Sequence, residues 1–183
     1  MKTLPREFYN QPTLKVAREL LGKILYYKIP SGPPARQAPG PRDKERILMG
    51  RIIETEAYLQ NDKACHASRG MTPRNAPMFG KPGFSYVYFT YGMHHCFNVV
   101  TQPEGTAEAV LIRSVEPMKG LVGKTDGPAK LCRAFGIDKK LNENDMTRGN
   151  FLIKDDGFRP RKIQKATRIG IKLDADKLWR FYY

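Results

Sequence analysis

Residues 47–59 alternate between two kinds of side chain, as a β-strand does. One set of alternate positions holds Ile53, Thr55, Ala57 and Leu59, and the other holds Glu54, Glu56 and Tyr58. Successive side chains of a strand point to opposite faces, so the pattern predicts one largely apolar face and one face with two carboxylates and a phenol. A polar strand face is most often simply solvated. Glu54 or Glu56 becomes a candidate general base only if this face lines a binding surface.

Two further segments have the composition of strands. Residues 23–29 follow a glycine and are mostly β-favouring, and residues 109–113 place Arg113 directly after four apolar residues. A charge at the end of such a run would be buried, and a buried guanidinium requires a carboxylate or phosphate partner. We therefore expect Arg113 to pair with one of them.

Residues 85–100 contain two β-favouring runs that meet at Tyr91-Gly92. A glycine at such a break supplies the positive φ that a two-residue hairpin turn needs, so the segment predicts a β-hairpin. Hairpin tips usually carry Asn, Asp or Gly, and a large aromatic there faces water unless something receives it. Tyr91 either folds back onto its own sheet or stacks on a partner such as a nucleobase.

Helical spacing appears in two places. In residues 13–21, Leu14, Ala17 and Leu21 share one stripe, with Thr13 as the expected cap and Gly22 as the stop.

The second helix is expected between Asp126 and Gly136, with Pro128 at its first position. Leu131, Ala134 and Phe135 would face inward. The N-terminus of a helix carries free N–H groups and a partial positive charge, so Lys130 in the first turn would complete a phosphate site there. An ordinary amphipathic helix accounts for the same residues.

The composition is that of one domain spanning residues 1–183, in which 40% of the residues are apolar. Residues 30–46 hold five prolines and predict a flexible surface loop. The 32 Lys and Arg exceed the 18 Asp and Glu and give a net charge of +14, which suits a polyanionic partner such as nucleic acid. Carboxylates at a binding surface do not help a protein to attract a polyanion. If Glu54 and Glu56 lie at such a surface, we therefore expect them to have a catalytic role.

The chain also lacks several familiar signals. Residues 1–10 have no apolar signal-peptide core, and no uncharged run approaches membrane-spanning length, so we expect an intracellular protein without a membrane partner. The three cysteines follow no disulfide framework and predict free thiols. The histidines and cysteines around His66 and Cys96 lack metal-ligand spacing, so no metal or other cofactor is expected.

Several separated motifs, in order over nearly the whole chain, resemble those of the alkyladenine (3-methyladenine) DNA glycosylases. They are Arg51-Ile52-Ile53-Glu54-Thr55-Glu56-Ala57-Tyr58, Thr72-Pro73-Arg74-Asn75 with Met78-Phe79, Tyr86-Val87-Tyr88 with Tyr91-Gly92-Met93 and Asn98, Leu111-Ile112-Arg113 with Glu116-Pro117, and Gly127-Pro128-Ala129-Lys130-Leu131-Cys132. The final residues, 178–183, resemble the Arg-Phe-Tyr strand of the same family.

The resemblance implies a role for each matching residue. Glu56 matches the general base that activates a water molecule, and Arg113 matches the arginine that helps to hold this water. Tyr58, His66 and Tyr88 match the aromatic walls of the family's base pocket. Asn98 matches the position whose side chain clashes with the 2-amino group of guanine. Tyr91 matches the residue that enters the duplex, with Met93 beside it. Lys130 and Arg74 match phosphate contacts.

The expected protein is therefore a monomeric, monofunctional purine glycosylase of base-excision repair. It would flip alkylated or deaminated purines, such as 3-methyladenine and hypoxanthine, out of double-stranded DNA and hydrolyse the N-glycosidic bond. The expected fold is a mixed α/β (α+β) single domain, with a curved and largely antiparallel sheet edged by helices and a protruding β-hairpin that enters DNA. Its compartment would be the cytoplasm and nucleoid of a bacterium or the nucleus of a eukaryote.

The main alternative is a non-catalytic basic module that binds structured DNA or RNA by shape with the same hairpin. Glu56 and Arg113 distinguish the two hypotheses. A binding module has no reason to bury these two side chains together in a pocket, whereas a hydrolase has.

Overall fold

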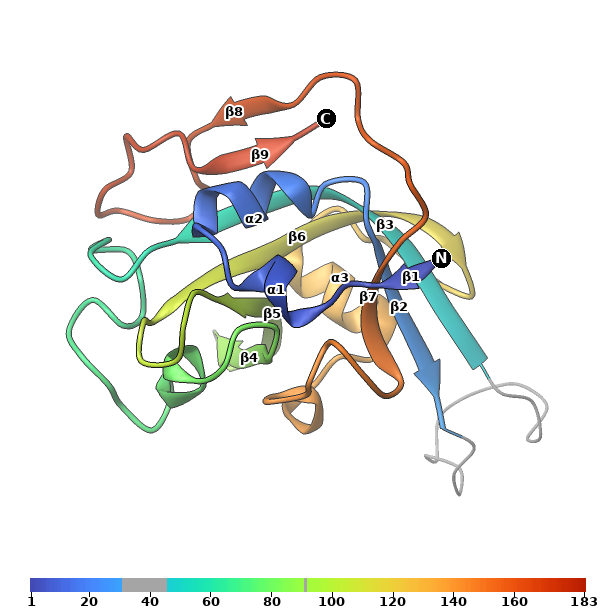
Figure 1. Cartoon of the computed structure of the whole chain (residues 1–183), viewed down its shortest axis with the longest axis horizontal. Coiled ribbons are helices and arrows are strands. Elements are labelled where there is room, and N and C mark those ends of the chain that lie inside the picture. The colour runs from blue at the N-terminus through green and yellow to red at the C-terminus, as the bar shows by residue number, and fades with distance from the viewer. Residues whose placement is uncertain (31–45, 91) are drawn as a thin grey trace.

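The computed structural model describes residues 1–30, 46–90 and 92–183, which form one domain built on a nine-stranded sheet (Figure 1). The elements in chain order are β1 (Lys2–Thr3), α1 (Arg6–Tyr9), α2 (Thr13–Glu19), β2 (Ile24–Ile29), β3 (Arg46–Tyr58), the 3-10 helix η1 (Ala76–Phe79), β4 (Ser85–Thr90), β5 (His94–Thr101), β6 (Glu108–Lys119), α3 (Pro128–Phe135), the 3-10 helix η2 (Lys139–Leu141), β7 (Phe151–Asp155), β8 (Gln164–Ala166) and β9 (Arg180–Tyr182).

The strands follow the order β1-β7-β2-β3-β6-β5-β4, and β9 pairs with both β3 and β8. Every one of these strand pairs is antiparallel. The expected single domain with a largely antiparallel sheet is confirmed, and its helices are few. Entry of the hairpin into DNA stays a prediction. The Pro-rich loop expected at 30–46 falls almost entirely on residues 31–45, outside the described ranges, and Arg46 already belongs to β3.

The long strand β3 is the centre of the sheet and carries the alternating pattern seen in the sequence. Its register with β6 shifts between Ile52 and Glu54 and again between Glu54 and Thr55. Such bulges change which side chains share a face. Ile52, rather than Ile53, is consequently the fully buried residue on the core side, together with Thr55 and Ala57.

The helices agree with the sequence in position but differ in their capping. Helix α2 ends at Glu19, and Thr13 is not its cap, because the Thr13 hydroxyl instead lies 2.6 Å from the hydroxyl of Thr101. Helix α3 begins at Pro128 and ends before Gly136, whose φ of 69° is the left-handed conformation that glycine adopts at helix C-termini.

The predicted hairpin is formed by β4 and β5, but its turn is longer than expected. The last pair in the register is Thr90 with His94, so three residues rather than two connect the strands. Gly92 has the positive φ, 68°, that was expected of it. The adjacent Met93 N–H donates to the Thr90 carbonyl at 3.3 Å.

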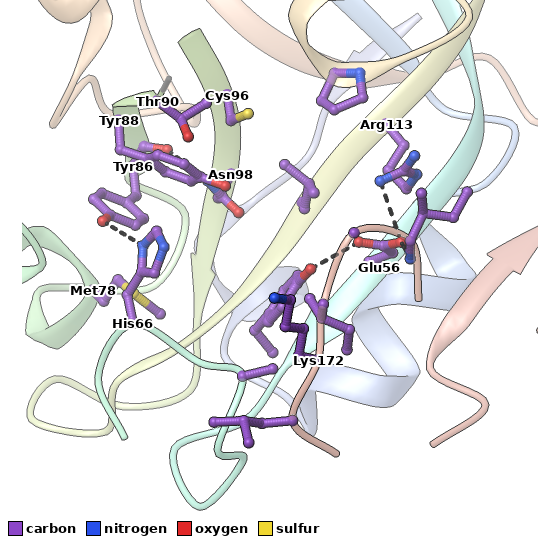
Figure 2. Close-up of a pocket in the computed structure, with 18 residues that line it drawn as sticks. Glu56, His66, Met78, Tyr86, Tyr88, Thr90, Cys96, Asn98, Arg113 and Lys172 are labelled. Carbon is purple, nitrogen blue, oxygen red and sulfur yellow. Dashed lines mark hydrogen bonds and ion pairs between the residues drawn. The ribbon is translucent and has the colours of Figure 1, made fainter. Parts of the chain in front are cut away.

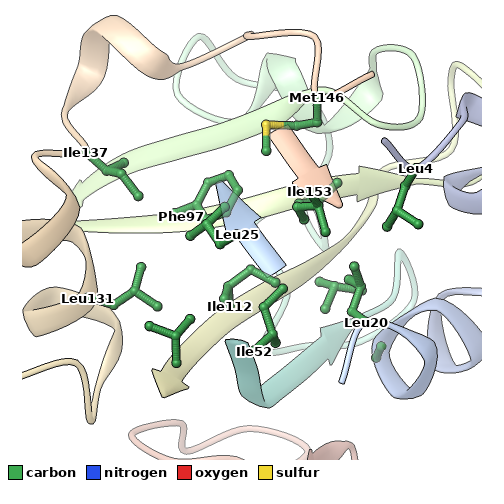
Figure 3. Packing of buried hydrophobic residues seen from close by; sticks show 14 of the residues in the cluster. Leu4, Leu20, Leu25, Ile52, Phe97, Ile112, Leu131, Ile137, Met146 and Ile153 are labelled. Carbon is green, nitrogen blue, oxygen red and sulfur yellow. The ribbon is translucent and has the colours of Figure 1, made fainter. Parts of the chain in front are cut away.

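The main core fills the space between the sheet and the helices (Figure 3). Leu20, which directly follows α2, Ile112 of β6 and Leu131 of α3 are fully buried. A second, smaller apolar cluster joins the loop that follows β3 to strands β4, β5 and β6. Its buried members are Cys65, Ala67, Met78, Tyr86, Val100, Ala107 and Ala109. In the part of the chain that is described, no helix has both the length and the apolar character needed to cross a bilayer.

Candidate active site

A pocket of about 530 Å³ opens where strands β3, β4, β5 and β6 lie side by side (Figure 2). Each strand contributes alternate residues, because only every second side chain of a strand faces the same way. Residues 169–173 close the pocket from the C-terminal part of the chain. The lining residues from the strands are Glu56, Tyr58, Tyr86, Tyr88, Thr90, Cys96, Asn98, Leu111 and Arg113.

Glu56 is fully buried at one end of this pocket. Its Oε1 accepts a hydrogen bond from the Ile169 N–H at 2.8 Å and forms an ion pair with Arg113 Nη1 at 3.2 Å. Its Oε2 accepts a hydrogen bond from the Tyr58 hydroxyl at 2.8 Å. A buried carboxylate is costly unless it is paired and hydrogen-bonded, and these three donors supply that stabilisation.

Arg113 connects the two carboxylates that the alternating pattern places on one strand face. Its Nε donates to Glu54 Oε1 at 3.2 Å, while Nη1 pairs with Glu56. Glu54 Oε1 also accepts a hydrogen bond from Arg180 Nη1 at 2.9 Å. The prediction that Arg113 pairs with a carboxylate is confirmed, and Glu56 and Arg113 are buried together in the pocket.

Tyr58 is held between this charge cluster and the aromatic part of the pocket. Burial is the main reason that the pKa of Tyr58 lies far above its usual value, and the neighbouring Glu56 raises it further. The phenol therefore keeps its proton at neutral pH. It acts as a permanent hydrogen-bond donor to Glu56.

The opposite wall of the pocket is aromatic. The rings of His66 and Tyr88 lie edge to face with centroids 4.6 Å apart, and Tyr86 is 5.4 Å from Tyr88. Tyr86 was not among the predicted site residues, although its spacing of two from Tyr88 on one strand was the signal for it.

His66 lies on the loop between β3 and η1, and Asn75 holds this loop in place. The Asn75 amide donates to the His66 carbonyl at 2.7 Å and to the Gly70 carbonyl at 3.0 Å. The His66 Nδ1 lies 3.0 Å from the Tyr86 hydroxyl. Burial, with a smaller contribution from the charge of Arg74, lowers the pKa of His66 to about 4, so the ring is neutral at pH 7.

Asn98 also lines the pocket, and it has a structural contact as well. Its amide nitrogen donates to the Tyr86 carbonyl at 3.0 Å, which fixes the side chain across the β4–β5 pair. Only 4% of the residue is exposed. The side chain is therefore rigid where it meets the pocket.

The other predicted residues that the structure describes, Lys130, Arg74 and Met93, do not line the pocket. Lys130 forms an ion pair with Asp126 at 3.1 Å, on a helix whose first residue, Pro128, reaches the pocket. The guanidinium of Arg74 lies 5.3 Å from the centre of the Tyr88 ring. Met93, 69% exposed, is next to the hairpin tip. Tyr91 lies outside the described residues.

Comparison with known protein families identifies the family to which this chain belongs. The family model described as methylpurine-DNA glycosylase matches residues 41–183. The chain belongs to the methylpurine-DNA glycosylase family. This confirms the resemblance found in the motifs, and the enzyme is accordingly a DNA glycosylase, a hydrolase of base-excision repair.

Individual relatives of this glycosylase match it over nearly their whole length. A protein of Methanocella arvoryzae is 45% identical over 199 residues, covering 100% of this chain and 92% of its own. One of Carboxydothermus hydrogenoformans is 47% identical over 193 residues, covering 98% and 94%. One of Legionella pneumophila is 45% identical over 187 residues, covering 100% and 94%. All three are named as 3-methyladenine DNA glycosylases.

Proposed function

We propose that this glycosylase removes alkylated and deaminated purines, including 3-methyladenine and hypoxanthine, from double-stranded DNA and leaves an abasic site. The observation that carries the proposal is the buried Glu56 carboxylate facing an aromatic pocket. A base inside a duplex is out of reach, so the nucleotide must be flipped out at a cost of a few kcal/mol. Stacking in the pocket offsets that cost.

Glu56 is the general base of the proposed reaction. A carboxylate offers about four lone-pair sites, and Ile169, Arg113 and Tyr58 occupy three of them. The fourth, on Oε2, accepts a proton from the attacking water. The water oxygen bonds to the anomeric carbon of the sugar, the bond from that carbon to the purine breaks, and the bonding electrons leave with the base. Arg113 helps to hold the water.

The pocket is suited to a flat and electron-poor base. Tyr58, His66 and Tyr88 form the walls of the proposed sandwich, and aromatic faces attract the positive charge of an alkylated purine. The low pKa of His66 supports this role, because a neutral imidazole does not repel a cationic base. Asn98 is the proposed gate against the 2-amino group of guanine.

The proposed DNA contacts lie outside the pocket. Lys130 and Arg74 contact phosphates, and Met93 enters the duplex beside Tyr91, where the flipped nucleotide leaves a gap. The net charge of +14 supports a polyanionic substrate. Residues 1–183 act as one glycosylase domain and as a monomer.

A duplex with one hypoxanthine, or one alkylated purine, at a defined position tests this function. Incubation with the enzyme followed by hot alkali is expected to break the lesion strand at that position only. The alternative of a non-catalytic binding module predicts a shifted band in a gel and an intact strand after alkali.

A further inference from the structure

A buried ion pair lies behind the pocket, outside the residues discussed so far. The side chains of Asp62 and Arg168 are both 0% exposed. Arg168 Nη1 contacts Asp62 Oδ2, and Nη2 donates to Oδ1 at 2.9 Å, so the pair is bidentate. The same guanidinium donates to the carbonyls of Ala57 at 3.0 Å and Asp174 at 3.3 Å.

The guanidinium also lies against two aromatic rings. Its central carbon is 4.7 Å from the centre of the Tyr58 ring and 5.1 Å from that of Trp179. A cation over an aromatic face is attracted by the ring, and the attraction is stronger where water is excluded. Arg168 therefore restrains the ring of Tyr58, whose hydroxyl is bonded to Glu56.

Arg168 is connected to Glu56 by a second route along the backbone. The next residue, Ile169, donates its N–H to Glu56 Oε1 at 2.8 Å. Two of the three donors to this carboxylate, the Tyr58 hydroxyl and the Ile169 N–H, are thus placed by one guanidinium. The surrounding segment between β7 and β9 has only the three residues of β8 as regular structure, so it relies on such a contact for its position.

Asp62 extends the connection to the other side of the pocket. Its Oδ1 accepts the Ala64 N–H at 3.2 Å, and the Cys65 N–H donates to the Asp62 carbonyl at 2.8 Å. This turn leads directly into His66. The ion pair therefore joins the loop of the aromatic wall to the segment that supplies a donor to Glu56.

We propose that Asp62 and Arg168 are positioning residues for catalysis, which fix the donors around Glu56 and its distance from the base pocket. The inference rests on the proposed role of Glu56 as general base. A buried ion pair contributes little net stability, because desolvation offsets the attraction, so stability alone is a poor reason for its presence. Precise placement of a catalytic group is a sufficient reason, since a displacement of that group by about 1 Å lowers the rate roughly 10²-fold.

The test compares variants that remove the pair with one that removes a distant pair. Arg168→Met leaves the buried Asp62 with only a long contact of 4.0 Å to Lys177 Nζ, and the loss of a buried partner is strongly destabilising. The double variant Asp62→Asn with Arg168→Met removes both charges and keeps an acceptor for the Ala64 N–H, so it is the form to use if the single variant does not fold. Lys23→Met is the control, because it removes the ion pair between the buried Lys23 and the partly exposed Asp155, neither of which lines the pocket.

We expect the Arg168 variants to lower the single-turnover excision rate on a hypoxanthine duplex by roughly 10- to 100-fold. Affinity for a duplex with a stable abasic-site analogue should stay within about twofold of wild type, and Arg168→Lys should recover part of the rate. Lys23→Met should lower the melting temperature but keep the excision rate.

The decisive arm repeats the Arg168 change in a Glu56→Gln background. The effects of residues that act as a unit are not additive. In the Glu56→Gln background, the Arg168 change should therefore lower the excision rate by no more than about twofold. An equal loss in both backgrounds, or an equal loss in Lys23→Met, would overturn the positioning role while leaving Glu56 as the base. If Glu56→Gln alone excises at the wild-type rate, the assignment of Glu56 as the general base fails, and this inference, which rests on it, fails as well.

Discussion

Arg113 and Glu56 form an ion pair of 3.2 Å between neighbouring antiparallel strands, and the same guanidinium holds Glu54 at 3.2 Å. The two carboxylates are nevertheless different. Glu54 is bonded to Arg180 as well and does not line the pocket, whereas Glu56 is fully buried within it. This asymmetry is the reason for assigning the base to Glu56 rather than to Glu54, which the sequence pattern could not separate.

Asn98→Ser is expected to raise excision of guanine-type bases relative to hypoxanthine. Guanine differs from hypoxanthine by its 2-amino group, and a rigid side chain excludes that group by a steric clash. The rate ratio on matched duplexes measures the effect, and Glu56→Gln in the same background should abolish both activities.

The contact of Asn98 with the Tyr86 carbonyl offers a competing explanation. If this bond is the whole function of Asn98, the serine variant should have a lower melting temperature and an unchanged ratio. That pair of results would make Asn98 a structural residue.

His66 is expected to titrate near pH 4 in the free enzyme, well below its usual value of about 6.5. Burial is the main cause, so Arg74→Gln should raise the pKa of His66 only partway. NMR titration of the ring protons measures this, with the signal assigned by its loss in His66→Gln. An inflection near 6.5 would contradict the buried, neutral ring.

The lowered pKa of His66 also makes the free energy of unfolding depend on pH in a predictable direction. Between pH 6.5 and about 4 the unfolded chain binds a proton at His66 and the folded chain does not, so the free energy of unfolding falls as the pH is lowered. We therefore expect His66→Gln to be more stable, relative to wild type, at pH 4.5 than at pH 7. Urea unfolding of both proteins at both pH values measures this. If the free energies of unfolding of His66→Gln and wild type differ by the same amount at pH 4.5 and pH 7, the lowered pKa of His66 is refuted.

Lys130→Ala is expected to reduce the salt dependence of DNA binding. A contact with one phosphate contributes about −0.9 to the slope of log affinity against log salt, so the slope should become shallower by about one for every sequence. Lys15→Ala is a matched control, because Lys15 forms a similar ion pair on α2. That helix packs on the face of β3 opposite Glu56, where the Thr55 hydroxyl donates to Ala17. Equal slopes in the two variants would remove Lys130 from the DNA contacts.

Much of the fold could be predicted because local signals agreed with it. Pro128 and Gly136 mark the two ends of α3, and Glu56 with Tyr58 reveals the pocket face of β3 by simple alternation. The position of Ile52 could not be predicted, because a bulge arises from the pairing of two strands and leaves no pattern in one of them. The capping prediction for Thr13 was wrong because its hydroxyl has a tertiary partner in Thr101.

The site was predictable where a residue's own chemistry demanded a partner. Arg113 follows an apolar run and therefore needed a carboxylate, and the structure supplies two. Ile169 could not be found in this way, because it contributes a backbone N–H, which every residue except proline has. Asp62 and Arg168 are 106 residues apart in irregular segments, so no periodicity relates them.

The account depends most directly on Glu56, and single-turnover excision by Glu56→Gln tests it. With enzyme in excess over a hypoxanthine duplex, we expect the rate to fall by about two to four orders of magnitude, the usual contribution of a general base, while affinity for the duplex is retained. Glu116→Gln, at an exposed position on β6, should excise at the wild-type rate. A Glu56→Gln rate close to wild type, in protein that binds the duplex normally, would contradict the account and make Glu54 the candidate base.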